Sequence, residues 1–121
     1  MKFDPNQPIY LQIAEYFSSR ILSRELGGGE RIPSVREIAS LVEVNPNTAM
    51  RAYHQLQEQG IIEQQRGIGY FTTARAYEIV LEQKRREFLQ QELPQFIEKL
   101  TQLGYSLSDL SSLAAQHKPD L

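Results

Sequence analysis

Amide, hydroxyl and guanidinium groups gather near the middle of the chain. Asn47, Thr48 and Arg51 follow closely on the dipeptide Asn45-Pro46. Side chains of these three types form hydrogen bonds with the edges of DNA bases and with phosphates. The cluster therefore predicts a DNA-reading surface. The alternative interpretation is an ordinary solvated helix face.

Two further arginines stand where DNA contacts are expected. Arg36 falls in the first turn of an expected helix, where free N–H groups favour a phosphate, although a surface arginine paired with glutamate would look the same. Arg66 precedes Gly67 and Gly69, which allow positive dihedrals and a close approach of the backbone to a groove. A phosphate-binding Gly-x-Gly would precede a helix, whereas this pair lies between two expected strands. A nucleotide site is therefore not expected.

The sequence lacks the residue patterns of enzymes and metal sites. The two histidines, His54 and His117, are far apart and have no carboxylate at metal-ligand spacing. Cysteine is absent, which excludes disulfides, thiolate metal ligands and cysteine nucleophiles. No serine stands in a nucleophile-elbow context. We expect no catalytic residues, no metal and no cofactor.

Two capped helices in tandem would position these side chains. Ser34 and Glu37 have the spacing of a capping box, so Ser34 is expected to act first as a cap, although it could also contact DNA. Asn45 can cap a following helix whose first residue is Pro46. The expected buried stripe of that helix consists of Ala49, Ala52, Tyr53 and Leu56. The pattern predicts helix, tight turn, helix.

Elements on both sides complete this arrangement. Apolar residues recur every four positions from Pro8, which predicts a first helix that ends near Leu26. The glycine triplet at 27–29 favours a flexible connector. Residues 61–65 and 70–73 read as the two strands of a hairpin.

The C-terminal part has a helical pattern with an apolar stripe. Pro94 is expected to kink or split the helix after Leu93, and Ser106 with Asp109 opens a short last helix through about Gln116. Too few elements remain to enclose the stripe, so it must pack on the first domain or on a second copy. Doubling a DNA-reading domain increases its affinity and site length, which favours a homodimer. The expected interface residues are Tyr77, Leu81, Phe88, Phe96 and Leu100.

Length and charge limit the possible architectures. The chain has 121 residues, enough for one domain with an appendage, and we predict a domain at 1–74 and a helical dimerisation tail at 75–121. The net charge of -2 counts against a polybasic surface, so positive charge must be concentrated by placement. No apolar leader or membrane-length stretch is evident, and we expect a cytoplasmic protein without a membrane partner.

Residues 9–73 resemble the winged helix-turn-helix of GntR-type bacterial transcription regulators. The resemblance rests on Ile32-Pro33-Ser34-Val35-Arg36-Glu37-Ile38-Ala39, Asn45-Pro46-Asn47-Thr48, Arg51-Ala52-Tyr53, Leu56, Gly60-Ile61-Ile62 and Arg66-Gly67-Ile68-Gly69-Tyr70-Phe71. The Asn-Pro-Asn-Thr form and the short tail are similar to the YtrA-type subfamily, which carries two dimerising helices in place of a large effector domain. The resemblance implies a mainly α fold with a small β-hairpin.

The resemblance also implies a function. A homodimeric repressor would bind double-stranded DNA at an inverted-repeat operator, often that of a transport operon that includes its own gene. By resemblance, Pro46 replaces an arginine found in many members, so a base contact made there does not transfer. The expected DNA-binding set is Ser34, Arg36, Asn45, Asn47, Thr48, Arg51, Arg66 and Gly67. No residue indicates a small-molecule effector, and a protein-interaction module built on the same fold is the alternative.

Overall fold

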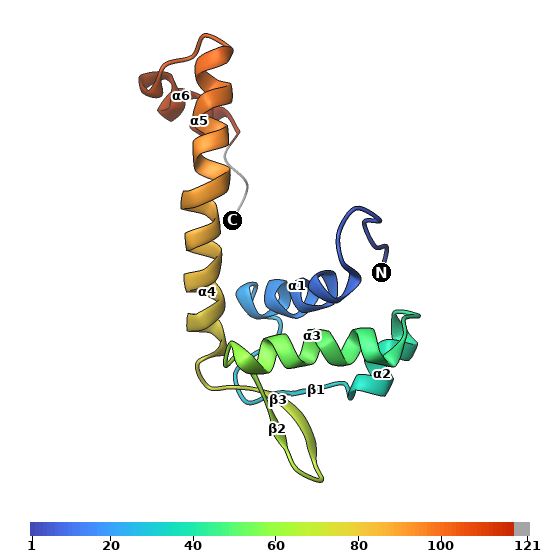
Figure 1. Ribbon diagram of the computed structural model, residues 1–121. Coiled ribbons are helices and arrows are strands. Elements are labelled where there is room, and N and C mark those ends of the chain that lie inside the picture. The colour runs from blue at the N-terminus through green and yellow to red at the C-terminus, as the bar shows by residue number, and fades with distance from the viewer. Residues whose placement is uncertain (118–121) are drawn as a thin grey trace. The chain divides into compact units, whose positions relative to one another are not determined.

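The computed structural model describes residues 1–117, and the chain divides into two compact units, Met1–Gln83 and the residues from Lys84 onward. The first unit contains three helices, a small sheet and the start of a fourth helix (Figure 1). The elements in chain order are α1 (Ile9–Leu22), β1 (Arg31–Ile32), α2 (Val35–Leu41), α3 (Pro46–Glu58), β2 (Ile62–Gln65), β3 (Gly69–Thr72), α4 (Ala76–Glu87), the π-helical turn η1 (Phe88–Glu92), α5 (Leu93–Gln102), the 3₁₀ turn η2 (Leu107–Asp109) and α6 (Leu110–Gln116).

The predicted hairpin is confirmed, and a third strand joins it. β2 and β3 pair antiparallel, with Gln65 opposite Gly69, and β1 pairs antiparallel with the other edge of β3. The hairpin projects away from the helices of this unit, with its turn at the free end (Figure 1). Because β1 has only two residues, it left no alternating pattern in the sequence.

Both predicted caps of the helix-turn-helix are present. The Glu37 backbone N–H donates to the Ser34 hydroxyl at 3.1 Å, and the Ser34 N–H donates to the Glu37 carboxylate at 3.0 Å. The Asn47 N–H donates to Asn45 Oδ1 at 2.8 Å, with Pro46 as the first residue of α3. Each bond satisfies a backbone donor that the first turn leaves free. The start of both helices is therefore fixed by local chemistry.

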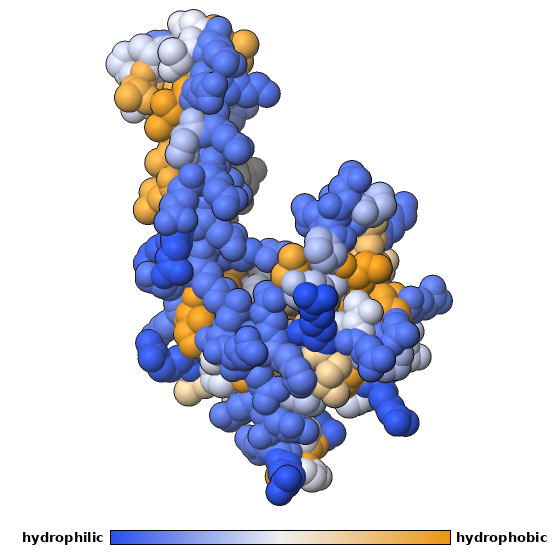
Figure 2. All heavy atoms as spheres, viewed as in Figure 1, coloured by the Kyte–Doolittle hydropathy of each residue, from blue (hydrophilic) through white to orange (hydrophobic). Residues whose placement is uncertain are grey.

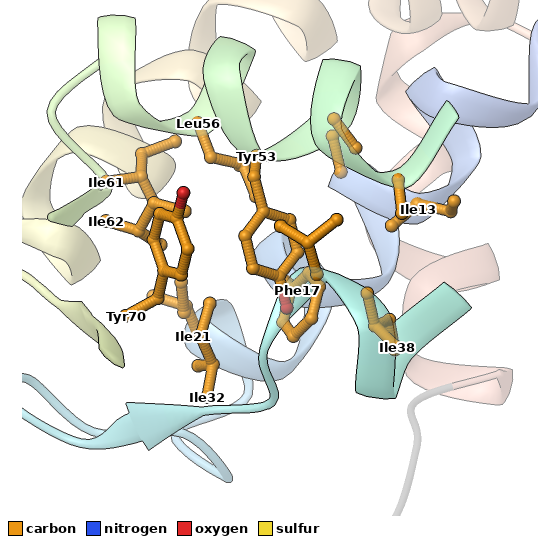
Figure 3. Close-up of a cluster of buried hydrophobic side chains, with 14 of the residues drawn as sticks. Ile13, Phe17, Ile21, Ile32, Ile38, Tyr53, Leu56, Ile61, Ile62 and Tyr70 are labelled. Atoms are coloured by element: carbon orange, nitrogen blue, oxygen red, sulfur yellow. The ribbon is translucent and has the colours of Figure 1, made fainter. Parts of the chain in front are cut away.

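The core of the first unit lies among α1, α3 and the sheet, and Tyr53 is at its centre (Figure 3). Its ring meets those of Phe17 and Tyr70 edge to face, with centroid distances of 5.6 and 4.9 Å. The Tyr53 hydroxyl donates to the Pro33 carbonyl at 2.5 Å, which ties α3 to the residue before the Ser34 cap. Burial, with Tyr70 and Glu37 nearby, raises the pKa of Tyr53 well above its ordinary value.

Replacement of Tyr53 by phenylalanine should destabilise this unit. The Pro33 carbonyl would lose its donor, and an unmade hydrogen bond of this kind costs about 1–3 kcal/mol of unfolding free energy. Denaturant titration of Tyr53→Phe measures this loss, with Tyr105→Phe as control because the Tyr105 ring is 45% exposed. Equal stability of the two variants would contradict the proposed role of the hydroxyl.

The glycine triplet is bonded to the sheet rather than free. The Gly29 N–H donates to the Thr72 carbonyl at 3.0 Å, and the fully buried Thr72 hydroxyl donates to the Gly27 carbonyl at 2.5 Å. The sequence predicts a flexible connector here because these hydrogen bonds cannot be inferred from local residues: their partner, Thr72, is distant in the sequence. The first helix also ends earlier than expected, at Leu22, and Arg24 follows it with a φ of 69°.

The core of the first unit continues into α4. Ala76 and Val80 are fully buried within it, and Tyr77 packs against it beneath the guanidinium of Arg24, whose Cζ is 3.5 Å from the ring centre. The first compact unit ends at Gln83, whereas the domain predicted from the sequence ends at residue 74. The first turns of α4 therefore belong to the first unit.

In the second unit, Pro94 follows a π-helical turn. The Leu93 N–H bonds to the Phe88 carbonyl, five residues back, and α5 then begins with Pro94 in its first turn. Because proline lacks an N–H and its ring clashes with the preceding turn, the wider π turn accommodates it without ending the helix. The Ser106–Asp109 cap and the last helix through Gln116 are as predicted. No helix within residues 1–117 has the length and apolar character needed to span a membrane.

Candidate nucleic-acid interface

The helix-turn-helix holds most of the predicted site residues within one unit. Arg36 is in the first turn of α2, Asn47 and Thr48 are in the first turn of α3, and Arg51 follows one turn later. The Thr48 side chain is half-buried, whereas the other three are exposed. The arrangement offers an amide, a hydroxyl and two guanidinium groups for hydrogen bonds with DNA.

The two capping residues keep some hydrogen-bonding capacity for a partner. The Ser34 oxygen accepts from Glu37, and its own O–H can still donate. In Asn45, Oδ1 accepts from Asn47, while the NH₂ group of the exposed side chain has two donors. Both residues can therefore cap a helix and donate to a phosphate at the same time.

The wing ends in a tight glycine turn. The Ile68 N–H donates to the Gln65 carbonyl at 2.9 Å, and Gly67 has a φ of 77°, a region that glycine adopts without strain. Arg66 and Gly67 are exposed at the tip, and Ile68 is 57% exposed beside them. The tip thus combines a cation, an apolar side chain and a backbone without a Cβ atom. These are the features of hairpins that enter a minor groove.

Arg31 is a basic residue of the interface region that the sequence interpretation did not assign. A Cβ atom at Gly69 would lie 3.1 Å from Nε of Arg31, so the guanidinium lies against the hairpin backbone at the start of β3, next to the wing turn. The charge of Arg31 also lowers the pKa of Glu37, after the larger effect of the Ser34 hydrogen bonds. Arg31 is thus near both the start of α2 and the wing. Only the pairing of β1 with β3 reveals this placement.

Tyr10 in α1 is the second residue that sequence interpretation missed. The Arg51 guanidinium lies over its ring, with 4.0 Å between Cζ and the ring centre. The two residues lie 41 positions apart in the sequence, so no local motif joins them.

Within residues 1–117, no group of three histidine, aspartate or glutamate side chains could hold a metal ion.

The predicted dimer residues divide between the two units. Tyr77 and the half-buried Leu81 belong to the first unit. In the second unit Leu100 is buried, whereas Phe88 is 46% and Phe96 48% exposed. Figure 2 shows hydrophobic surface, in orange, along one edge of the α5 segment. Exposed aromatic side chains of this kind are typical of a surface that another chain covers.

Comparison with known proteins places the helix-turn-helix and wing in one family. Residues 9–72 match the family model described as bacterial regulatory proteins, gntR family. The chain is 38% identical to the uncharacterized HTH-type transcriptional regulator YhcF of Bacillus subtilis, over 90% of this chain and 88% of that protein. It is 34% identical to the HTH-type transcriptional repressor YtrA of the same organism, over 91% and 85%.

Solved structures agree with these matches. A GntR family transcriptional regulator from Listeria monocytogenes is 33% identical, with a TM-score of 0.75 over 94% of this chain and 98% of that one. The structure of AraR(DBD) in complex with operator ORR3 has a TM-score of 0.54 and 26% identity, over 60% of this chain and 88% of that one. The similarity to the Listeria structure thus includes the C-terminal helices as well as the winged domain.

Proposed function

Because the chain belongs to the GntR family of bacterial regulatory proteins, whose members are DNA-binding transcription regulators, we propose that it is a sequence-specific repressor that binds an inverted-repeat operator as a homodimer. One observation supports this most strongly: the capped start of α3 presents Asn47 and Arg51 to solvent, and Arg36 is exposed in the first turn of α2. A helix that opens in this way is suited to a major groove.

Each part of the interface has a proposed task. Asn47 and Arg51 of α3 would contact base edges, and Thr48 would bond to a base or a phosphate. Arg36, with the Ser34 hydroxyl and the Asn45 amide, would bind backbone phosphates at the helix starts. Arg31, Arg66 and Gly67 would hold the wing on the flanking backbone or in the minor groove. Placement of arginines on one face would offset the net charge of -2.

The second unit would supply the dimer contact. Phe88 and Phe96 expose apolar rings that no other described residue covers fully. A two-fold pairing of this face is self-complementary. It would present the helix-turn-helix of each protomer to one of two half-sites of opposite orientation. Leu100 is buried in the second unit and would support this face from within, and the half-buried Tyr77 and Leu81 of the first unit remain proposed interface residues.

The direction of regulation is proposed from a relative. The 34% identical YtrA protein is named a transcriptional repressor. By family resemblance, the operator would control a transport operon, with the gene for this regulator among its targets. We place the protein in the cytoplasm, where bacterial DNA is located.

Footprinting on the DNA upstream of its own gene tests the proposed function. We expect protection of one inverted repeat, with half-sites separated by about one helical turn of 10–10.5 base pairs or a multiple. Transcription of the downstream gene should rise when that repeat is scrambled. Uniform weak protection would contradict the proposal and favour a protein-interaction module.

Loss of the wing arginine should weaken binding without changing sequence preference. Arg66→Ala removes one expected phosphate contact per protomer, so the slope of log affinity against log salt should become shallower by about 2 for a dimer. Titrations at several salt concentrations measure the slope, with Arg75→Ala as control because Arg75 is exposed and paired with Glu78. An unaltered slope for Arg66→Ala would exclude the phosphate role.

A further inference from the structure

The ring of Tyr10 and the guanidinium of Arg51 form a contact between α1 and α3, which we name the Tyr10–Arg51 pair. Arg51 Cζ lies over the ring, 4.0 Å from its centre. Tyr10 is half-buried and packs against the hydrophobic core, so its ring has a fixed place in the first unit. A cation at this distance over a ring is attracted to the negative face of the π system.

Arg51 differs in its partner from another exposed arginine of the same unit. Arg75 donates from Nε to the Glu78 carboxylate at 3.3 Å, which occupies one of its hydrogen-bond donors. Arg51 has no carboxylate partner among residues 1–117. A guanidinium has five N–H donors. When it stacks on an aromatic ring, it contacts the ring face and does not use these donors for a hydrogen bond to an oxygen atom. Arg51 therefore keeps donors for a phosphate or a base edge.

An exposed arginine on a recognition helix has an entropic disadvantage. Its long side chain samples many rotamers, and these must be restricted when it contacts DNA. A contact that restricts the side chain beforehand reduces this loss on binding. The ring of Tyr10 provides such a contact, because the core fixes the ring and the ring attracts the guanidinium.

We propose that Tyr10 is a positioning residue, which holds Arg51 in the orientation from which it contacts the operator. The proposal rests on the proposed function, since it requires operator DNA as the ligand of Arg51. It assigns a role in DNA recognition to α1, a helix that otherwise serves the core. A homodimer would have one Tyr10–Arg51 pair for each half-site.

A double-mutant cycle on the full chain tests this role. Tyr10→Leu keeps an apolar side chain but removes the aromatic face, and Tyr10→Phe, which keeps it, is the matched control. At the lower range of a cation–π contact, Tyr10→Leu should weaken binding to the footprinted operator duplex about two- to fivefold per half-site, or about four- to 25-fold for a dimer. Tyr10→Phe should stay within about twofold of the wild type, because its ring offers the same π face.

The decisive comparison uses Arg51→Ala as the background. There, Tyr10→Leu should cause no further loss, because the side chain that it positions is gone. Thermal melting of each variant reports on folding, and Tyr10→Met is a second variant if leucine lowers the melting temperature. Equal losses from Tyr10→Leu with and without Arg51 would overturn the positioning role and leave a structural one. So would an unchanged affinity of a well-folded Tyr10→Leu protein.

The same titrations separate failure of this inference from failure of the proposed function. A scrambled duplex is titrated in parallel with the wild-type protein and with each variant. Wild-type binding that is equal on both duplexes would overturn the proposed function and the role of Tyr10 with it. Wild-type preference for the operator, together with uncoupled effects of Tyr10 and Arg51, would overturn the role of Tyr10 alone.

Discussion

The double variant Phe88→Glu/Phe96→Glu is expected to be a monomer whose operator affinity is reduced at least about a hundredfold, because linked binding modules gain about 10²–10⁴ in avidity. Both rings are about half exposed in the single chain, so the substitutions should leave the fold intact. In a dimer they would place unpaired carboxylates in an apolar contact, where the cost of desolvation is high. A monomer then binds one half-site at a time.

Sedimentation equilibrium and operator titration measure the two effects together. The double variant Gln91→Glu/Gln95→Glu is the matched control, because it adds the same two negative charges at exposed polar positions of η1 and α5. Circular dichroism should show unchanged helix content in both proteins. A double variant that remains dimeric would place the dimer contact elsewhere and refute the assignment of Phe88 and Phe96.

Asn47→Ala is expected to have the second largest effect. An asparagine side chain that bonds to adenine through both its oxygen and its NH₂ group is worth about 1–3 kcal/mol of discrimination, and a dimer would lose this in both half-sites. The expected reduction in operator affinity is therefore about 30-fold or more. Preference for one base pair per half-site should be relaxed. The fold should be unaffected, because the cap of α3 uses the backbone N–H of Asn47 rather than its side chain.

Competition with operator variants, each changed at one base pair, measures that preference. Gln59→Ala serves as control, since it removes an exposed amide from the C-terminal end of the same helix. Equal loss of affinity for operator and scrambled duplexes would show that Asn47 binds phosphate. An unchanged affinity would remove Asn47 from the interface.

Local chemistry explains which parts of the fold could be predicted. The starts of α2 and α3 depend on Ser34, Glu37 and Asn45, whose side chains bond to backbone groups two or three residues away. The wing depends on glycines at its turn, and Gly67 has the expected positive φ. Signals of this kind are contained in a few consecutive residues. The structure confirms them.

Contacts between distant residues explain what could not be predicted. The glycine triplet is held in place by hydrogen bonds with Thr72, which is distant in the sequence. The strand β1 forms only because β3 lies beside it. Pro94 predicts a kink or a split in the helix, but the π turn that accommodates it depends on the backbone of residues before it. These features required the tertiary structure.

The candidate site divides in the same way. Arg36, Asn47 and Arg66 could be proposed from their places next to caps and turns, and their assignment to DNA contacts stays a prediction. Arg31 and Tyr10 could not be proposed from the sequence, because the contacts that single them out are with Gly69 and Arg51, which are distant in the sequence. A cation–π contact between two helices leaves no periodic signal.

Titration of the purified protein against its footprinted inverted repeat and against a scrambled duplex, over a range of salt, tests the central claim most directly. A sequence-specific regulator should prefer the repeat by about 10³-fold or more near physiological salt, and the preference should persist as salt reduces both affinities. Two protomers should bind per repeat. Equal affinity for both duplexes at every salt concentration would contradict the claim.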